Sequence, residues 1–269
     1  MMRLIISMVV YRTPIEAIKP LLDEALHGLG AIPYEVHILD NADDGKLQSW
    51  CKQNLYGYHC LGRNVGFGKG HNEIFKRTTQ KNATYLFLNP DIEISGSAIK
   101  KALAFLKKNP RVGLLSPKLL NRDGSIQLAC RFIPKPYTLI KRFLFKSTSD
   151  AFPLSAYKNN FLAPFIHGAC FFMRGEVFKS VGGFDERYFM YMEDLDLCRK
   201  IQSKKLSVTL FNEVTAIHHH HKGSAKNFKL FLYHVRSFIR YFNKWGWFID
   251  KKRKSMNEAF ERSLNLKDL

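Results

Sequence analysis

The sequence predicts an α/β fold in which a mostly parallel sheet carries helices on both faces. Short apolar runs alternate with segments of helical periodicity through the first hundred residues, the pattern of consecutive strand–helix units. The first run, "LIISMVVY", has only eight residues and no small-residue cleavage site after it, so we expect a buried strand and not a signal peptide. With 269 residues and 46% hydrophobic content, the chain is large enough for one substantial core.

The first strand, 4–10, is followed by "TPIE", a helix-start signal. We expect Thr13 to be the N-cap and Pro14 to occupy the first helical position. Apolar residues at helical spacing follow and end near Gly30. The next elements are predicted in the order strand 34–40, helix 46–55, strand 57–61, helix 70–80 and strand 84–89. Ligands of such sheets bind beyond the carboxyl ends of the strands, where Asp40 and Asp91 lie.

The second half of the chain has fewer regular patterns. The "VGLLS" run at 112–116 predicts a strand, and the "DG" pair after it predicts a hairpin turn. Residues 131–160 are basic, aromatic and interrupted by proline, which predicts a long surface loop or lid. A strand at 167–174, a helix after it and a pair of strands at 206–218 complete this part.

Residues 225–269 form a basic and aromatic tail. One helical stripe of the tail is apolar and consists of Phe228, Leu232, Val235, Ile239 and Phe242. A second stripe is basic and consists of Lys229, Arg236, Arg240 and Lys244. Such a helix suits an anionic membrane surface, and it equally suits packing on the rest of the protein with a solvated basic face. The sequence favours neither interpretation over the other.

The overall charge narrows the partners without choosing one. Forty-two Lys and Arg against 23 Asp and Glu give a formal net charge of +19, which attracts phosphates of nucleic acids, nucleotides or lipid headgroups.

The five cysteines form no CxxC pair, so reduced thiols in a cytosolic protein are expected. A nucleic-acid-binding protein remains the main alternative to an enzyme, although no recognised reader motif is present.

Two motifs at the predicted carboxyl edge of the sheet suit a nucleotide site. "LNPDIEI", residues 88–94, places Asp91 just past a buried strand, where it is either a divalent-metal ligand or the cap of the next helix. "GRNVGFGKGHN", residues 62–72, is a glycine-rich loop before a helix and carries Arg63 and Lys69. Such a loop brings backbone N–H groups close to a diphosphate, but it matches neither GxGxxG nor the P-loop.

A third motif, "GGFDERYFMYMEDLDLCRK" at 182–200, suits proton transfer. It places Glu193, Asp194 and Asp196 within four positions, directly after several aromatic residues. Carboxylates beside apolar side chains form bases with a tuned pKa. The alternative is an acidic first turn of a helix, which accounts for the charge but not for the aromatic residues.

In order and spacing, these motifs resemble those of the inverting family 2 glycosyltransferases of GT-A fold, and within them the rhamnosyltransferase-like members. The matching segments are "VVY", "LDN", "RNVGFGKGHN", "LNPD", "HGACFFMR", "GGFDERYFMYMEDLDLC" and the final "H…GS". They extend over about four fifths of the chain. The resemblance implies a GT-A (Rossmann-like) catalytic domain over 1–224, followed by the tail at 225–269.

The resemblance also assigns roles to individual residues. Asp194 would be the catalytic base, with Glu193 beside it. Asp91 would bind Mg or Mn, although Asn89 stands where the family's DXD motif has its first aspartate. The nucleotide-sugar site would comprise Val10, Tyr11, Asp40, Arg63, Asn64, Gly66, Gly68, Asn72, Asn89 and Gly168.

The run "HHHH" at 218–221 supplies a further metal ligand by the same resemblance. Adjacent residues of an extended strand point to opposite faces, so the four side chains cannot all reach one ion. His218 and His220 share one face. We expect His218 to be the metal ligand, with His220 second.

The implied activity is transfer of a sugar from a nucleotide-diphosphate sugar to a glycan or polyprenyl-diphosphate-linked acceptor, in cell-surface polysaccharide synthesis. Deoxythymidine-diphosphate (dTDP) rhamnose is the first candidate donor, and uridine-diphosphate (UDP) sugars are second. We expect the protein in the cytoplasm or on the inner face of the cytoplasmic membrane, with no nucleic-acid partner. A sugar nucleotidyltransferase is the other enzyme alternative, but it would carry a Gly-rich, Lys-containing loop where this chain has "YRTP".

Overall fold

A computed structural model describes residues 3–78, 83–145, 151–152, 160–219 and 228–265. Its centre is a nine-stranded sheet with the order β3-β2-β1-β4-β10-β6-β11-β5, in which β8 pairs with β11. These strands are β1 (Arg3–Val10), β2 (Tyr34–Asp40), β3 (Gly57–Cys60), β4 (Ala83–Leu88), β5 (Ile92–Glu93), β6 (Val112–Asn121), β8 (Phe161–Leu162), β10 (Cys170–Arg174) and β11 (Ser207–His218). A small second sheet pairs β7 (Cys130–Arg131) with β9 (Phe165–Ile166).

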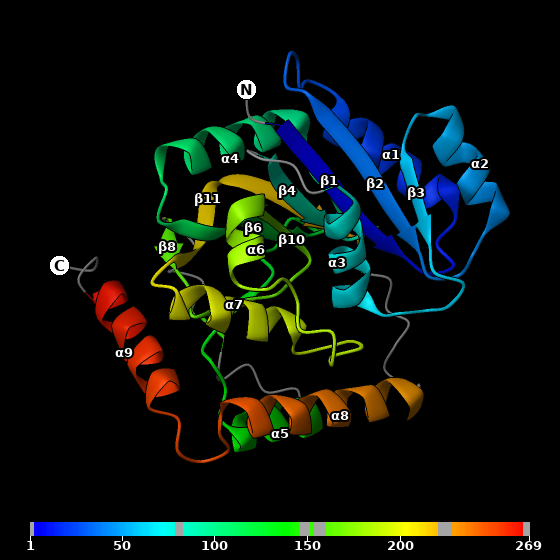
Figure 1. Ribbon diagram of the computed structural model, residues 1–269. Helices are drawn as coiled ribbons and strands as arrows, with labels where there is room; N and C mark the ends of the chain where they lie inside the picture. The colour runs from blue at the N-terminus through cyan, green and yellow to red at the C-terminus, as the bar shows by residue number, and fades with distance from the viewer. Residues whose placement is uncertain (1–2, 79–82, 146–150, 153–159, 220–227, 266–269) are drawn as a thin grey trace.

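Helices cover both faces of the sheet (Figure 1). They are α1 (Ile15–Leu26), α2 (Gly45–Gln53), α3 (Phe67–Thr78), α4 (Gly96–Lys108), α5 (Pro136–Phe145), α6 (Gly175–Ser180), α7 (Glu193–Ser203), α8 (Phe228–Trp245) and α9 (Lys251–Asn265). Successive residues of β1 alternate between the two cores: Ile6 packs with α1, α2 and α4, whereas Ile5 packs with α6 and α7. The predicted α/β fold with helices on both faces is therefore confirmed.

The two halves of the sheet differ in direction. Strands β3, β2, β1 and β4 are all parallel, as the alternating pattern predicts. Strand β10 then runs antiparallel to both β4 and β6, and β6 is parallel to β11. The carboxyl ends of β1, β2 and β4 meet at one edge, and β11 ends beside the residues that follow β4 because it pairs with β5.

Four local predictions were wrong. Pro14, not Thr13, is the residue before α1, because its ψ of 148° keeps it extended. Helix α3 begins at Phe67, inside the segment expected to be a loop. Helix α5 lies within the predicted loop 131–160, and Pro136 occupies its first position, where the missing N–H costs nothing. Residues 207–218 form a single strand that is irregular between Phe211 and Thr215, instead of a pair.

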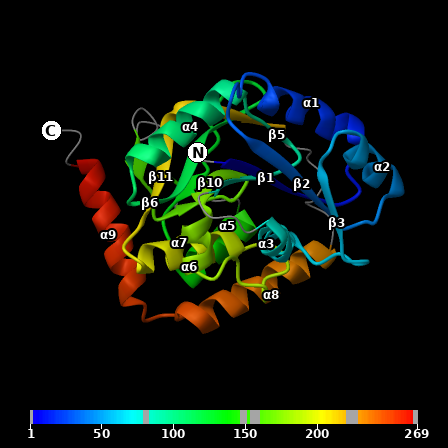
Figure 2. The same cartoon turned by 45° about the horizontal axis from the view of Figure 1, so that its top comes forward.

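The tail packs against α7. Arg199 of α7, 1% exposed, makes two hydrogen bonds to the Asp250 carboxylate at 2.6 and 2.9 Å. Asp196 of α7, which has no exposed surface, accepts from Lys244 and from the Trp245 indole of α8 at 2.6 Å. Figure 2 shows α8 beyond α7 as seen from the sheet. The tail thus packs on the rest of the protein, which is one of the two alternatives predicted for it. The predicted domain boundary at 224 lies outside the described residues and stays a prediction.

Among the residues that the structure describes, no helix is both long enough and apolar enough to cross a bilayer.

Candidate active site

Two predicted metal ligands meet at the edge of the sheet. The Nε2 atom of His218, at the end of β11, lies 3.2 Å from Oδ2 of Asp91, just after β4. The next helix is capped by Ser95, so Asp91 is not a helix cap, and that alternative is excluded. Strand pairing of Ile92 with His218 fixes this meeting, because it aligns the end of β11 with the segment after β4.

The pair fits a divalent cation. Two ligand atoms at about 2.1 Å from one ion and at right angles are about 3 Å apart, close to the observed separation of Asp91 and His218. The other ring nitrogen of His218, Nδ1, lies 3.0 Å from Oε1 of Gln127, the outer contact that orients a metal-binding histidine. Within the described residues no group of three His, Cys, Asp or Glu side chains gathers, so this part of the chain would supply two ligands.

The neighbouring His219 has other partners than His218. Its ring bridges Glu93 at 2.7 Å and Arg122 at 2.9 Å. Its backbone N–H donates to the Asp91 carbonyl at 2.7 Å, which helps to hold the loop that carries Asp91. His220 lies outside the described residues, so its role as second choice for the ligand is not addressed.

Asp194 lies at the start of α7 with its carboxylate partly exposed. Its Oδ2 accepts from the Gly168 N–H at 3.0 Å and its Oδ1 accepts from the Leu195 N–H at 2.8 Å. Burial raises the pKa of Asp194, but these hydrogen bonds and the nearby His167 outweigh it, so the pKa lies below its usual value. The carboxylate is therefore ionised at neutral pH and able to accept a proton.

His167 and Arg131 extend this arrangement on the other side. The Arg131 Nε–H donates to Nε2 of His167 at 3.2 Å, so the ring proton is placed on Nδ1. That Nδ1 faces Oδ2 of Asp194 at 3.7 Å, too far for a good hydrogen bond but close enough to favour the charged carboxylate.

Glu193 behaves differently from its neighbour. Its side chain is 6% exposed, and Oε2 has no hydrogen-bond partner in the structure. Burial first, and the charge of Asp194 second, raise the pKa of Glu193 well above its usual value. Glu193 is therefore the weaker acid of the two, and Asp194 is the one whose ionised form is favoured.

The two-residue segment 168–169 connects the loop that carries Asp91 with Asp194. The Ala169 carbonyl accepts from the Asn89 N–H at 2.9 Å, while the adjacent Gly168 N–H binds Asp194. A Cβ on Gly168 would lie 2.9 Å from the Cβ of Asp194, so only glycine permits this approach. The segment 168–169, which directly precedes β10, therefore holds Asp194 at the edge of the sheet where β4 ends, the edge that also carries Asn89 and Asp91.

The glycine-rich segment packs against the loop that precedes Asp194. Gly66 has φ +82°, and a Cβ there would lie 2.0 Å from the Phe189 carbonyl oxygen. A Cβ on Gly68 would likewise lie only 2.8 Å from the Cβ of Phe184. The helix and the loop are therefore in close contact at this glycine. The amide of Asn72 is fully engaged by the backbone N–H and C=O of Phe184, each at 2.9 Å. These contacts explain the residue types; nucleotide contacts by Gly66, Gly68 and Asn72 stay a prediction.

Two other residues of this segment have different surroundings. Asn64 accepts from the Gly66 N–H at 2.9 Å, which closes a tight turn, and Arg63 is exposed beside it. Lys69, expected to help bind a diphosphate, forms an ion pair with Glu186 at 3.1 Å. A role of Arg63 and Asn64 at the diphosphate therefore remains a prediction.

A hollow of about 460 Å³ opens beyond the ends of β1 and β2, lined by Arg12, Thr13, Pro14, Ala42 and Asp44. Asp40 lies below it, 1% exposed, and its carboxylate accepts from two backbone N–H groups of the loop 42–44 and from Tyr58. Val10 is buried beside Asp40 through strand pairing, and Tyr11 is half exposed with Arg12 over its ring. Asp40 thus shapes the hollow where the base and ribose of a nucleotide are expected.

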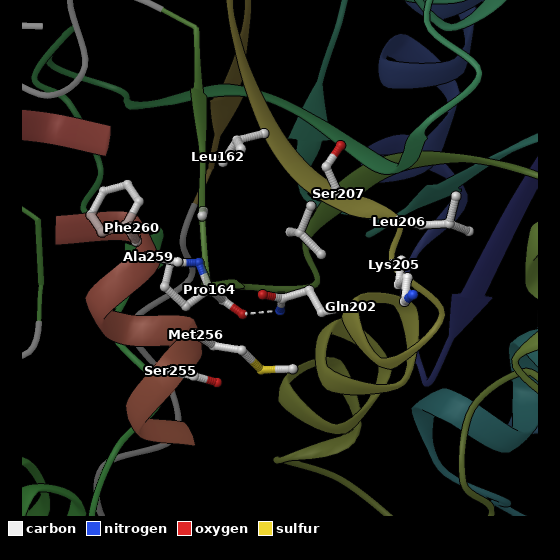
Figure 3. Close-up of a pocket in the computed structure, with 12 residues that line it drawn as sticks. Leu162, Pro164, Gln202, Lys205, Leu206, Ser207, Ser255, Met256, Ala259 and Phe260 are labelled. Atoms are coloured by element: carbon white, nitrogen blue, oxygen red, sulfur yellow. Dashed lines mark hydrogen bonds between the residues drawn. The ribbon is translucent and has the colours of Figure 1, made fainter. Parts of the chain in front are cut away.

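A cavity of about 440 Å³ lies elsewhere, between α9 and the carboxyl end of α7. Figure 3 shows Met256 and Phe260 of α9 on one wall and Gln202 on the other, where Gln202 donates to the Pro164 carbonyl at 2.7 Å. Asp194 stands at the opposite end of α7, about 12 Å from Gln202 along the helix. This cavity is therefore separate from the candidate active site.

Sequence reasoning missed three residues of the site: Gln127, Arg131 and His167. The first two come from the short segment after the hairpin at "DG", which the structure confirms through the Asn121 and Ser125 backbone. His167 directly precedes the predicted Gly168. Their side chains act on His218 and Asp194, residues far away in the chain, and no local pattern signals such contacts.

Sequence comparison finds similar proteins among sugar transferases. The chain is 28% identical to a low-salt glycan biosynthesis hexosyltransferase of Haloferax volcanii over 68% of its own length and 58% of that protein. It is 27% identical to the N-acetylglucosaminyl-diphospho-decaprenol L-rhamnosyltransferase of Mycobacterium tuberculosis, over 77% of this chain and 74% of the relative. A rhamnosyltransferase of Escherichia coli is 26% identical, over 85% and 87%. No family model matches the chain.

Structure comparison shows the same fold. The structure superposes on GalNAc-T7 with UDP, GalNAc and Mn²⁺ at a TM-score of 0.67 and 13% identity, covering 94% of this chain and 49% of the other. It superposes on a Pyrobaculum calidifontis mannosyltransferase with GDP-Man and Mn²⁺ at 0.58 and 15% identity, covering 90% and 63%. The chain therefore has the GT-A fold of glycosyltransferases, and its similarity to rhamnosyl- and hexosyltransferases is confirmed. It spans less than two thirds of the length of the archaeal relative.

Proposed function

We propose that this protein is an inverting glycosyltransferase that moves a hexose from a nucleotide-diphosphate sugar to a hydroxyl of a glycan or lipid-linked glycan. One observation carries the proposal. Asp91 and His218, a pair suited to a cation, and Asp194, an ionised and partly exposed carboxylate, are held at one edge of a GT-A sheet through the segment 168–169.

Asp194 acts as the base in this proposal. Direct transfer requires an acceptor hydroxyl that loses its proton as it attacks the anomeric carbon. Gly168 and Leu195 keep the carboxylate ionised and fixed, and His167 faces it from the side. Glu193 is buried and its pKa is raised, so its carboxyl group is the less readily ionised of the two. Attack from the face opposite the leaving diphosphate inverts the anomeric centre.

Asp91 and His218 would hold a divalent cation, Mg²⁺ or Mn²⁺. When bound, this ion supplies positive charge that stabilises a leaving diphosphate. Gln127 orients His218, and the backbone of His219 fixes the Asp91 loop. The support is the geometry of the pair, together with the Mn²⁺ named in two GT-A neighbours.

Donor and acceptor follow from the relatives. Two of the three are rhamnosyltransferases, so dTDP-rhamnose is the first donor to test and UDP-sugars are second. The mycobacterial relative is named for a decaprenyl-diphosphate acceptor, which favours a polyprenyl-diphosphate-linked glycan here. Such a lipid acceptor agrees with a protein that works at the inner face of the cytoplasmic membrane.

A donor screen tests the proposal. Each nucleotide sugar is added with Mn²⁺, and both thermal stabilisation and transfer to N-acetylglucosaminyl-diphospho-polyprenol are measured. We expect one nucleotide sugar to raise the melting temperature and to serve as donor. Absence of both effects for all donors, with salt-sensitive RNA or DNA binding instead, would contradict the proposal and favour the nucleic-acid alternative.

A further inference from the structure

The inner face of α8 is bound to the loop that leads to Asp194. Ser237 donates to the Met190 carbonyl at 2.8 Å, and the guanidinium of Arg240 donates to the Arg187 carbonyl. The ring of Tyr191 stacks on α8 with a centroid distance of 3.6 Å to His234. Tyr191 and Met192 both have positive φ, at 70° and 67°, directly before Glu193 and Asp194. Helix α8 therefore holds a strained loop in place.

The outer face of the same helix carries an apolar stripe. Phe228, Leu232, Val235 and Ile239 follow one another at intervals of four, three and four residues, so they share one side of the helix. Their exposed fractions are 72%, 48%, 38% and 43% in this order. We call these four residues the outer stripe. It lies on a different side from Ser237 and Tyr241, which are buried against the protein. Phe242, the last residue of the apolar stripe predicted from the sequence, is also fully buried, so the exposed stripe ends at Ile239.

Two more apolar side chains extend this edge of the molecule. Phe248 and Ile249, in the turn after α8, are 86% and 84% exposed. Figures 1 and 2 both place α8 and this turn along the same outer edge. Large aliphatic and aromatic side chains so exposed mark an interaction surface when they are contiguous.

The charge beside the outer stripe selects the partner. No Asp or Glu occurs from 214 to 249, whereas Lys229 and Arg236, both exposed, each lie one residue after a member of the stripe. A second copy of this chain would bring the same positive charge and repel it, since the net charge is +19. The four stripe residues include three aliphatic side chains, which have no stacking role with nucleic-acid bases. An apolar stripe flanked by cations fits the interface of an anionic bilayer.

We propose that α8 docks on an anionic lipid surface through the outer stripe, with Arg236 at the headgroups. The helix then has two functional sides: one inserts into the lipid interface, and the other carries the loop 185–192. If the protein is the glycosyltransferase proposed above, docking places the Asp194 loop next to the membrane, where a polyprenyl-linked acceptor is anchored. The lipid contact itself does not depend on that activity.

Vesicle co-sedimentation of the full-length protein, without any nucleotide sugar, tests the docking. Vesicles of phosphatidylcholine with phosphatidylglycerol are compared with pure phosphatidylcholine. We expect the anionic vesicles to bind the protein, and the double variant Leu232→Glu/Ile239→Glu to bind at least about tenfold more weakly, since each buried aliphatic side chain contributes about that factor. Arg236→Gln should weaken binding to a smaller extent.

Leu55→Glu is the matched control, because Leu55 is 94% exposed and lies outside α8. It adds the same single charge as Leu232→Glu alone, which should bind more weakly than the wild type, whereas Leu55→Glu should bind as the wild type does. Melting temperatures check that all variants are folded. Equal binding of wild type and the double variant would overturn the proposal. So would absence of binding to anionic vesicles, or a dimer of the wild type that the double variant dissociates. The donor screen is independent, so loss of docking and loss of transfer activity are distinguished.

Discussion

Replacing Asp250 with alanine removes a buried ion pair that attaches the tail to α7. Both oxygens of Asp250 bind Arg199, and the two side chains are 4% and 1% exposed. In the variant the Arg199 charge stays buried, with a hydrogen bond to Tyr241 at 3.1 Å and the Trp245 ring at 4.3 Å as its remaining contacts. Breaking one side of a buried ion pair costs about 3–5 kcal/mol.

Urea unfolding followed by tryptophan fluorescence measures this cost, since two of the three tryptophans, Trp245 and Trp247, belong to the tail. A loss of about 3–5 kcal/mol corresponds to a melting temperature lowered by about 6–10 °C in a chain of this size. Asp23→Ala is the control: its ion pair with Lys19 is more than half exposed, so it should cost about 0.5 kcal/mol or less. Equal, small losses in both variants would refute the proposed attachment.

Two further variants test the surroundings of the site. Gln127→Leu removes the contact that orients His218 and should weaken Mn²⁺ binding by about 10–100-fold in a metal titration; unchanged affinity would exclude this role. His167→Phe removes a group that lowers the pKa of Asp194, so that pKa should rise. Because the base is active only when deprotonated, activity is lost as pH falls through its pKa, and the acid limb of kcat should move to higher pH. An unmoved limb would count against His167.

The parallel half of the sheet could be predicted because it depends on local patterns. Each strand from 4–10 to 84–89 is an apolar run followed by a helix, and neighbours in sequence remain neighbours or near neighbours in the sheet. The mixed half could not be predicted in this way. Strand β10 inserts between β4 and β6 although it lies some fifty residues beyond β6, and a long-range pairing of this kind leaves no periodic trace.

Glycine misled the prediction of α3. Gly68 and Gly70 indicated a loop, because each costs a helix about 1 kcal/mol relative to alanine. In the structure both glycines are helical. A Cβ at Gly68 would press on Phe184, and a Cβ at Gly70 would press on Val9, so the packing of the helix requires glycine at both positions. Close packing of the helix therefore outweighs its intrinsic propensity. These packing contacts account for the two glycines without a phosphate-binding loop.

The candidate site was predicted where its residues end a regular element. Asp91 follows a buried strand, His218 ends another and Asp194 begins a helix, so strand and helix boundaries locate all three. Gln127 and His167 were missed because their importance depends on which distant side chain they face. The structure supplies that information through His218 and Asp194.

The most direct test of the central claim compares Asp194→Asn with Glu193→Gln in the same transfer assay. The account predicts that Asp194→Asn loses at least about 100-fold in transfer rate while donor binding, measured by thermal stabilisation, is nearly unchanged. Glu193→Gln should keep most of the activity, because Glu193 is buried and is not the carboxylate that accepts the proton in this account. Full activity of Asp194→Asn, or an equal loss in Glu193→Gln, would contradict the assignment of Asp194 as the base.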